Sequence, residues 1–361
     1  MVTSGFACAG LPGAFGLPCA KAAPPADVDN AYEPYGVHTH LPWTWIYKTD
    51  AEVIKALTMM RDAGIQWARM GARWQNVEPR RGKYSQEQVQ RFDLIVKEAG
   101  RIGIRIALLM NGTPKWASLE PATKDFQAYA PRDPADWERY VNFLVRRYSG
   151  PISYWEIRNE IDLPLFWKSG LPAYVDNLKR ASRVIKDANP SNRVILAGLA
   201  GDGVNPDGKK SEPNVLQRIY DLGAAPYFDV VAIHCYYRPT GAQSRRIPVE
   251  KLKTARQVME RNNDHAKPLW MNELGLHSLA GPDGPAISDN QLADEIVQVY
   301  PALLELPFVA KVFWYNFRCM GTDHNDQARQ RGLVRFDMTP RTLYEAYRRM
   351  PKYREIPRRA R

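Results

Sequence analysis

Short apolar runs alternate with amphipathic segments of helical period along most of this chain, and no other feature constrains its fold as strongly. The apolar runs cover residues 35–40, 65–70, 104–110, 154–159, 194–199, 230–236, 269–273 and 309–317. The segments of helical period cover residues 50–63, 86–101, 134–148, 171–188, 214–222, 248–262, 289–305 and 340–350. Such alternation indicates βαβ units and a parallel sheet.

The number of repeats favours a closed (β/α)8 barrel, the TIM barrel of the α/β class, over an open doubly wound sheet. An open sheet has about five or six strands and a glycine-rich phosphate turn after the first. No G-x-G-x-x-G motif follows the first run, and the chain has no Walker A sequence. Asp50 and Ser85 are expected to cap two of the helices. We therefore predict a single (β/α)8 domain over residues 32–355, with a long polar loop at 201–213.

The first 22 residues have features of an export signal. Residues 5–20 are small and apolar, and Ala20-Lys21-Ala22 fits an A-x-A cleavage site. The basic residues expected before them are missing, as in a truncated signal. We expect an exported protein, periplasmic or secreted, with a linker at 23–31 and a basic tail at 356–361. No later stretch of about 20 apolar residues exists, so stable membrane insertion is not expected.

The composition narrows the range of partners. The formal net charge of +11 fits an acidic polymer or an envelope surface, although much of it is expected to be solvated surface charge. No zinc-finger spacing or RNP-like strand is present, so no nucleic-acid partner is expected. Signal cleavage would leave Cys235 and Cys319, for which two free thiols are the simpler expectation than a disulfide. We expect a monomer that needs no cofactor.

Two carboxylates occupy the positions where a barrel enzyme holds its reactive groups. In a TIM barrel these groups lie at the carboxyl ends of the strands and in the loops that follow. Glu160 closes the fourth apolar run and Glu273 closes the seventh, so they are expected almost opposite each other across the barrel mouth. Glycoside hydrolysis needs such a pair flanking the scissile bond, and a separation of about 5–5.5 Å makes the enzyme retaining.

Four motifs carry a resemblance to a known group of enzymes. They are Trp74-Gln75-Asn76-Val77-Glu78-Pro79 with Gly82-Lys83-Tyr84, Thr113-Pro114-Lys115-Trp116, residues 154–160, and Trp270-Met271-Asn272-Glu273-Leu274-Gly275. Over residues 35–317 the chain resembles clan A glycoside hydrolases, particularly family 39 and the Psl-type exopolysaccharide glycosidases. The resemblance implies that Glu160 is the general acid/base and Glu273 the nucleophile.

The same resemblance implies roles for the residues around this pair. Asn159 corresponds to the ligand of the sugar 2-hydroxyl, Arg69 to the arginine that keeps the nucleophile ionised, and Tyr236 to its hydroxyl donor. His234 belongs to the same group, and Trp314 corresponds to the platform under the reacting sugar. Arg158 departs from the pattern, because many relatives have an aromatic residue there.

Other candidates for substrate binding come from the loops after the strands. Five tryptophans are expected on the catalytic face, and at least two of them to stack on sugar rings: Trp43, Trp45, Trp74, Trp116 and Trp167. His40 and Asn111 follow the first and third runs and are expected in the same groove. Trp137, inside a helical segment, is expected in the core.

The chemistry implies a division of labour between the carboxylates. The acid must hold its proton, so burial and the neighbouring Glu273 charge are expected to raise the pKa of Glu160. We predict a retaining, double-displacement hydrolase of β-glycosidic bonds in a polysaccharide or oligosaccharide, such as an extracellular or envelope exopolysaccharide. Two alternatives remain: a metal-dependent amidohydrolase-type barrel using His38, His40 and His234, and a carbohydrate-binding barrel without activity. We favour a site without metal.

Overall fold

The computed structural model describes residues 33–201, 213–280, 284–323, 325–327 and 329–352. The elements in chain order are β1 (Tyr35–Thr39), α1 (Asp50–Asp62), β2 (Trp67–Arg73), α2 (Trp74–Val77), α3 (Gln86–Arg101), β3 (Arg105–Asn111), η1 (Phe126–Ala128), α4 (Pro134–Tyr148), β4 (Tyr154–Ile157), α5 (Gly170–Ala188), β5 (Arg193–Ile195), α6 (Val215–Asp221), η2 (Ala225–Tyr227), β6 (Val231–Tyr237), α7 (Arg246–Arg261), β7 (Leu269–Leu276), α8 (Asp289–Leu304), β8 (Val309–Tyr315) and α9 (Thr342–Arg349). The predicted export signal, the predicted linker, residues 202–212 of the predicted polar loop at 201–213 and the predicted basic tail lie outside the described residues.

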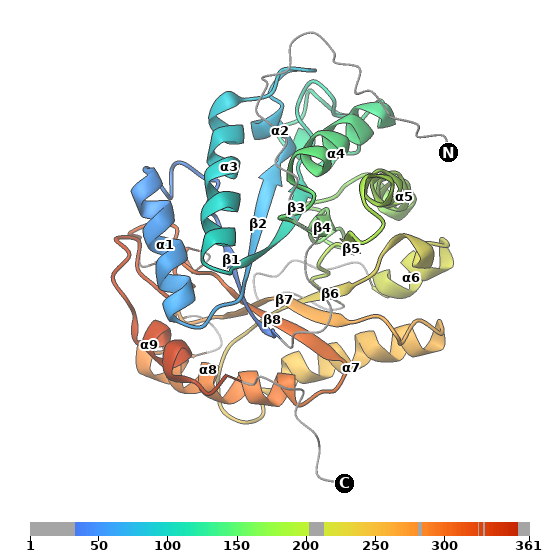
Figure 1. Ribbon diagram of the computed structural model, residues 1–361. Coiled ribbons are helices and arrows are strands. Elements are labelled where there is room, and N and C mark those ends of the chain that lie inside the picture. The colour runs from blue at the N-terminus through green and yellow to red at the C-terminus, as the bar shows by residue number, and fades with distance from the viewer. Residues whose placement is uncertain (1–32, 202–212, 281–283, 324, 328, 353–361) are drawn as a thin grey trace, which may run out of the picture.

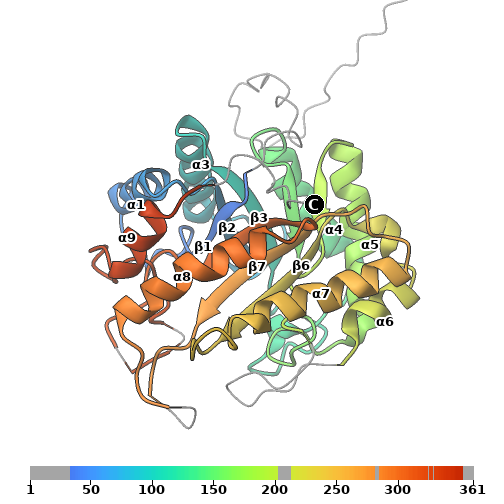
Figure 2. The ribbon, with the colours of Figure 1, turned by 90° about the horizontal axis from the view of Figure 1, so that it is seen from below.

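The eight strands form one parallel sheet in the order β5-β4-β3-β2-β1-β8-β7-β6. Single bridges, Ile195 to Val230 and Leu199 to Ile233, join β5 to β6 and close the ring. The helices surround the strands (Figure 1). Seen from below, α7 and α8 lie along the outside of β6 and β7 (Figure 2), and α8 also packs against β8. The predicted (β/α)8 barrel is confirmed.

Local sequence signals set the helix boundaries. The Ser85 side chain accepts from the Gln88 backbone N–H and caps α3, as predicted. At α1 the cap is Thr49 rather than the predicted Asp50, because Thr49 and Glu52 form a reciprocal capping box. Asp50 is instead the first helical residue, where its negative charge is favourable to the helix dipole. Helices α3 and α4 begin and end where the periodicity predicts.

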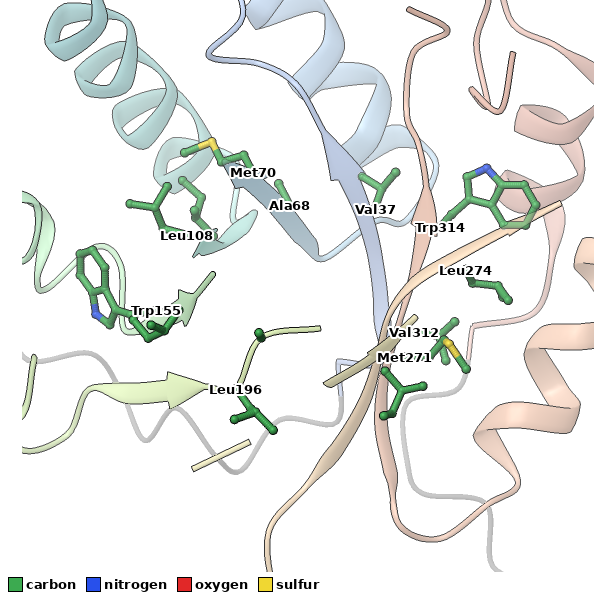
Figure 3. Packing of buried hydrophobic residues seen from close by; sticks show 14 of the residues in the cluster. Val37, Ala68, Met70, Leu108, Trp155, Leu196, Met271, Leu274, Val312 and Trp314 are labelled. Carbon is green, nitrogen blue, oxygen red and sulfur yellow. The ribbon is translucent and has the colours of Figure 1, made fainter. Parts of the chain in front are cut away.

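The hydrophobic core has two parts. The larger part lies between the strands and the surrounding helices, and Figure 3 shows residues of it such as Val37, Leu108, Trp155 and Leu274. The smaller part, here called the floor cluster, consists of Trp67, Ala107, Tyr154, Ile195, Val230, Ala232, Trp270 and Phe313. Its aromatic rings pack at short range, with 5.7 Å between the Trp67 and Trp270 centroids.

The period-two alternation of the strands leads from the floor cluster to the opposite end of the barrel. In β2, Trp67 of the floor cluster is followed two residues later by the buried Arg69, and Arg73 at the end of the strand lines a cavity. In β4, Tyr154 is followed by the buried Glu156. Because alternate residues of a strand point to the same side, floor residues and polar residues come from the same faces of the strands.

A β-bulge in β7 breaks this alternation. Ile233 of β6 pairs with Met271, but the next residue, His234, pairs with Glu273. Asn272 is therefore the extra residue of the bulge, and both Asn272 and Glu273 make contacts with polar groups inside the barrel. Bulges commonly re-aim side chains next to active sites. This one places two consecutive polar residues where regular pleating would place one.

Candidate active site

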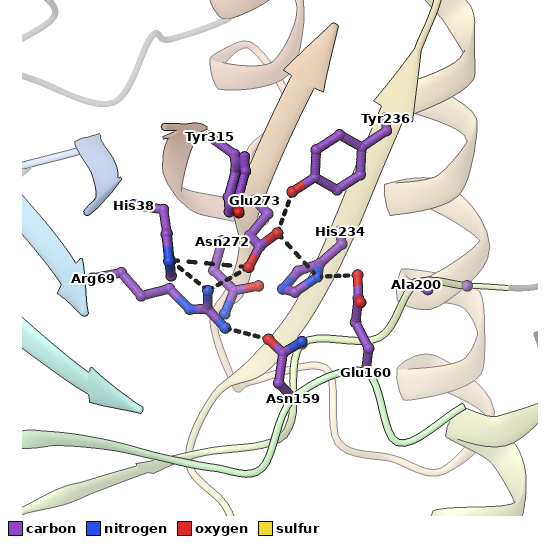
Figure 4. Close-up of polar contacts among 12 residues, drawn as sticks. His38, Arg69, Asn159, Glu160, Ala200, His234, Tyr236, Asn272, Glu273 and Tyr315 are labelled. Carbon is purple, nitrogen blue, oxygen red and sulfur yellow. Dashed lines mark hydrogen bonds and ion pairs between the residues drawn. The ribbon is translucent and has the colours of Figure 1, made fainter. Parts of the chain in front are cut away.

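A cavity of about 540 Å³ opens at the carboxyl ends of the strands. Its walls come from several strands and from the loops after them. The residues that line it are His38, His40, Trp43, Gly71, Arg73, Leu109, Asn111, Asn159, Glu160, Leu163, Leu165, Phe166, Tyr236, Glu273, His277, Tyr315, Gln327 and Arg331. Figure 4 shows the polar group in it, with Glu160 and Glu273 on opposite sides of His234.

The two predicted carboxylates meet in this cavity. A side-chain oxygen of Glu160 and one of Glu273 lie within 4.8 Å of each other, and both residues are more than nine-tenths buried. Retaining glycosidases hold the two carboxyl groups about 5–5.5 Å apart, whereas inverting enzymes separate them by about 6.5–9.5 Å to leave room for a water. The approach within 4.8 Å is closer to the first of these spacings than to the second.

Glu273 is surrounded by donors that favour its ionised form. Arg69 Nη1 donates to Glu273 Oε1 at 2.5 Å, and the Tyr236 hydroxyl donates to Oε2. Arg69 is fully buried and also donates to both oxygens of Glu156, at 2.6 and 2.8 Å. Burial acts to lower the pKa of Arg69, but the charges of Glu156 and Glu273 outweigh it and raise that pKa. The guanidinium therefore stays charged beside the predicted nucleophile.

Arg69 also orients Asn159. Its Nη2 donates to Asn159 Oδ1 at 2.8 Å, which occupies the amide oxygen. The NH2 group of this amide is then the part left to contact a ligand in the cavity, as a donor. A sugar hydroxyl needs a donor of this kind, so the geometry fits the role that the resemblance implies for Asn159.

Glu160 lies against His234, with 2.8 Å between Glu160 Oε1 and His234 Nδ1. Burial lowers the pKa of His234, so its imidazole is neutral near pH 7. The Glu160 backbone has a φ of 42°, a strained conformation for a residue with a side chain, and its N–H donates to the Gly198 carbonyl at 2.9 Å. Such strain is typical of functional sites.

Gly198 helps to fix the positions of Glu160 and His234. A Cβ at position 198 would overlap His234 Nε2 and lie 2.8 Å from Asn272 Oδ1. Only glycine therefore allows the imidazole to take the place in which Nδ1 reaches Glu160. Gly198 was not among the predicted residues, because no local motif distinguishes it.

Trp314 does not line the cavity and so does not fit its predicted role as the platform under the sugar, whereas its neighbour Tyr315 does line it. Trp314 is 1% exposed, belongs to the larger core, and donates from Nε1 to the Arg331 carbonyl at 3.1 Å. Phe313 belongs to the floor cluster, and by the period of two Tyr315 is the next residue on that inner side. Tyr315 lines the cavity and stacks on His38, with ring centroids 5.0 Å apart.

Most of the predicted loop tryptophans are structural. Trp74 is fully buried and donates to Glu78, and Trp167 is 4% exposed and donates to the Gly170 carbonyl. Trp116 packs edge-on against Trp74, with 5.6 Å between the ring centroids. None of these three lines the cavity, so the predicted substrate contacts of Trp74, Trp116 and Trp167 do not fit the structure.

Trp43 does line the cavity, stacked on His40 at 4.2 Å, and Trp45 lies beside it with half its surface exposed. Of the five loop tryptophans expected on the catalytic face, Trp43 alone is a wall residue. His40 and Asn111 are wall residues too, as predicted.

Trp167 does not line the cavity, and its ring packs against the guanidinium of Arg158. The guanidinium is 1% exposed and lies over the Trp137 and Trp167 rings, 4.4 and 5.0 Å from their centroids. It donates to Thr113 and Asn177, and burial lowers its pKa to about 9. The departure from the family pattern at this position is therefore a packing feature behind the cavity.

Glu156, Tyr315, Gln327 and Arg331 complete the site but were not among the predicted residues. Glu156 binds Arg69 and also accepts from Asn272 Nδ2 at 3.0 Å. The side-chain period of two along a strand could have identified Glu156, two residues after Tyr154, and Tyr315, two residues after Phe313. Gln327 and Arg331 lie in the long segment after β8, where no periodicity applies.

One group of side chains could hold a metal ion in the described part of the chain. It consists of Glu160, His234 and Glu273, so of the predicted histidines His38, His40 and His234 only the last belongs to it. Arg69 donates to both Glu273 and His38 Nδ1, the latter at 2.7 Å. A buried guanidinium in contact with Glu273 of this group and with His38 repels a cation, so the donor set does not fit the amidohydrolase alternative.

Two further sequence expectations concern the rest of the chain. Cys235 and Cys319 are both buried and both free thiols. Within residues 33–352, apart from the short gaps, no helix combines the length and apolar character that crossing a membrane requires.

Comparisons with solved structures support the fold. A family 39 glycoside hydrolase from Bacteroides cellulosilyticus WH2 superposes with a TM-score of 0.68 at 21% identity, covering 88% of this chain and 63% of that one. The exo-β-1,4-mannosidase Op5Man5 from Opitutaceae bacterium strain TAV5 gives 0.69 at 17% identity, covering 92% and 62%. This chain thus spans less than two thirds of either protein.

A subfamily 18 enzyme of glycoside hydrolase family 5 from Streptomyces cattleya, solved with GlcNAc, also superposes with a TM-score of 0.69 at 16% identity, covering 91% of this chain and 83% of that one. No curated protein sequence matches this chain. The family assignment rests on a sequence model, Cellulase (glycosyl hydrolase family 5), which matches residues 27–307 and so most of the barrel. The chain is a clan A glycoside hydrolase, as the sequence predicts, and it belongs to glycosyl hydrolase family 5.

Proposed function

We propose that this protein is a retaining β-glycosidase in which Glu273 attacks the sugar and Glu160 handles the proton. The observation that carries this proposal is the approach of the two carboxylates to within 4.8 Å over the cavity. Their surroundings differ in the required sense. Arg69 and Tyr236 donate to Glu273, while Glu160 faces a neutral imidazole.

In the first step Glu273 Oε attacks the anomeric carbon. The bond from that carbon to the leaving oxygen breaks, and the proton of Glu160 passes to this oxygen, which departs as an alcohol. A glycosyl ester on Glu273 results. Asn159, held by Arg69, donates to the 2-hydroxyl, a contact that strengthens as the ring flattens. Tyr315 supplies an aromatic wall for the sugar ring.

In the second step a water attacks the same carbon from the side that the leaving group vacated. Glu160, now a carboxylate, takes a proton from this water, and the ester bond to Glu273 breaks. Two inversions at one carbon return the original anomeric configuration. Arg69 and Tyr236 stabilise the departing Glu273 carboxylate, since both donate to it in the resting enzyme.

The proposed substrate is a β-linked glycan of an extracellular or envelope polysaccharide. The similar structures include an exo-β-1,4-mannosidase and a family 5 enzyme solved with Manβ1-4GlcNAc, and both involve β-linked sugars. The motif resemblance to family 39 and Psl-type glycosidases supports an exopolysaccharide. The signal-like residues 1–22 support export, and we propose that the protein acts as a monomer.

Chemical rescue tests this assignment. Glu273→Ala and Glu160→Ala are incubated with aryl β-glycosides of glucose, mannose, xylose and glucuronic acid, with and without azide. We expect azide to restore turnover of Glu273→Ala with an α-glycosyl azide as product, because azide replaces the nucleophile. For Glu160→Ala we expect a β-glycosyl azide, because the glycosyl-enzyme forms first. Near wild-type turnover of either variant without azide contradicts the assignment.

A further inference from the structure

The walls of the cavity hold two arginines that have no carboxylate partner in the described part of the chain, Arg73 and Arg331. Arg73 ends β2, and its guanidinium lies over the Trp43 ring, 4.2 Å from the centroid. Arg331 lies after β8, with its guanidinium 4.5 Å from the centroid of the Tyr236 ring. Both are partly buried and both line the cavity.

Other partly buried arginines show how this fold usually treats such a charge. Arg105 pairs with Glu33 at 2.8 Å, Arg139 with Asp136 at 2.6 Å, and Arg245 with Glu295 at 2.8 Å. In these three the charge taken partly out of water is compensated by a carboxylate. Arg158 and Arg238 have no carboxylate partner in the described residues, but they donate to side-chain or backbone oxygens instead. Unpaired charges are costly to bury, so two guanidinium groups in the wall of one cavity, neither with an oxygen acceptor in the described part of the chain, need an explanation.

The contacts that the two arginines make do not neutralise them. Arg73 donates no side-chain hydrogen bond within the described residues, and burial lowers its pKa. Arg331 has one side-chain contact of this kind, from Nη2 to His277 Nδ1 at 3.2 Å, and its Nε is buried without an acceptor. Both guanidinium groups therefore keep N–H donors without an acceptor in the described residues, and both side chains line the cavity.

The remaining charges of the cavity leave room for an anion. Its carboxylates are Glu160 and Glu273, and Arg69 already donates to Glu273. Burial lowers the pKa of both His38 and His40, that of His40 to about 3, so both are neutral near pH 7. Two planar guanidinium groups with free donors match carboxylates, which they bind with two parallel hydrogen bonds.

We propose that Arg73 and Arg331 bind carboxylate groups carried by the sugars of the substrate, which makes an acidic glycan the substrate class of this enzyme. This inference rests on the proposed function, since it concerns the same cavity. The contact to Tyr236 places Arg331 beside the ring whose hydroxyl donates to Glu273, close to the reacting sugar. Arg73 lies with Trp43 and His40, in position for a neighbouring sugar. The carboxylate belongs either to a uronic acid or to a pyruvate ketal.

The test compares each acidic polymer with its neutral, carboxyl-reduced form, here called its reduced twin. Xanthan, hyaluronan and a mannuronate-rich alginate are each offered beside their carboxyl-reduced forms, and xanthan also without its pyruvate ketals. Cleavage is measured as kcat/KM, and binding to Glu160→Gln by calorimetry. We expect at least one acidic polymer to be preferred over its reduced twin by about tenfold or more, an advantage that shrinks as salt is added. Loss of the advantage on depyruvylation identifies a pyruvate ketal, and its persistence identifies a uronate.

Substitutions of the two arginines test whether they cause the preference for acidic polymers. Arg331→Gln and Arg73→Gln are expected to lose most of the advantage for the acidic form, with smaller effects on the reduced twin. Arg331→Lys is expected to restore part of it, because it keeps the charge but not the paired donors. Arg329→Gln is the matched control: Arg329 lies two residues away, is exposed, and pairs with Asp326 outside the cavity wall.

Equal or better cleavage and binding of every reduced twin overturns the acidic-glycan proposal, and so does a failure to bind any acidic polymer. Either result leaves the retaining assignment intact if the enzyme still hydrolyses neutral β-glycosides through Glu160 and Glu273. Failure of the azide rescue, by contrast, removes the retaining assignment whatever the binding preference.

Discussion

The interior of this barrel has two ends built from the same strands and opposite in character. At one end is the floor cluster, in which Trp67 packs edge-on against Tyr154 and Trp270, and these two rings stack on each other. The other end is here called the polar mouth. There, two residues further along β2 and β4, Arg69 and Glu156 form a fully buried ion pair. The side-chain period of two supplies both ends, and only the residue types differ.

Stability and activity depend on different ends of the barrel. Aromatic packing at the floor removes large apolar surfaces from water and stabilises the fold. A buried ion pair adds little net stability, because desolvation offsets most of the Coulombic attraction. The ion pair at the polar mouth therefore serves mainly to position Glu273. Isosteric changes of the catalytic carboxylates should lower activity and spare stability, whereas truncations in the floor cluster should lower stability and spare activity.

The largest expected effect is at the mouth. Glu160→Gln should lower kcat by about 10³-fold or more on unactivated substrates, because a positioned general acid contributes up to about 10⁴-fold. The isosteric amide should keep the unfolding midpoint within a few degrees. Steady-state kinetics with calorimetric melting measures both, and a variant that loses stability in proportion to activity would contradict the separation.

The next effect is at the floor. Trp270→Ala should destabilise the protein by about 3–5 kcal/mol, because it removes a fully buried indole from the floor cluster. Urea unfolding gives this value, and kcat per folded molecule should stay within about twofold. Trp45→Ala is the control, since half of that side chain is exposed and its loss should cost less than about 0.5 kcal/mol. A floor variant that folds normally but is inactive would refute the division.

A smaller effect is expected at Gly198, which lies against the polar mouth. Gly198→Ala should lower kcat by about 10- to 100-fold, because the new methyl group displaces His234 from Glu160. The shape of the pH–rate profile should change with it, which a purely structural defect would not cause. Gly100→Ala in α3 has nothing within 4 Å of the new methyl group and should leave kcat unchanged.

The smallest effect concerns pH and stability. The folded pKa of His40 is about 3, mainly because of burial, and its unfolded value is about 6.5. Below pH 6.5 the unfolded chain binds a proton that the folded chain refuses, so stability falls as the pH falls toward 3. His40→Gln should reduce the slope by about 1.4 kcal/mol per pH unit between pH 5.5 and 4. Identical slopes for the two proteins in urea unfolding would show that His40 is not buried neutral.

Much of the fold could be predicted from the sequence, because apolar residues recur with a different period in helices and in strands. The bounds of α3 and α4 follow from the apolar stripe and the caps. Strand ends were less accurate: the fifth apolar run extends to residue 199, but β5 ends at Ile195 and the following residues join β6 through single bridges. Local pattern does not reveal where a ladder ends.

Glu160 and Glu273 were predictable from their positions at the ends of strands, and the resemblance to clan A enzymes pointed to Arg69 and Tyr236. The place of Asn272 was not predictable, because a bulge in β7 turns it into the barrel together with Glu273. Nor does the sequence tell a tryptophan that stacks on a sugar from one such as Trp74 that packs on its neighbours. These differences depend on tertiary contacts.

The anomeric configuration of the first product decides whether Glu273 acts as the nucleophile. Wild-type enzyme is incubated with a β-glycan that it cleaves, and proton NMR follows the new reducing end before mutarotation. The spacing of Glu160 and Glu273 predicts the β-anomer as the initial product, with the α-anomer appearing later at the spontaneous rate. An α-anomer formed first would mean a single displacement by water, which contradicts Glu273 as the nucleophile.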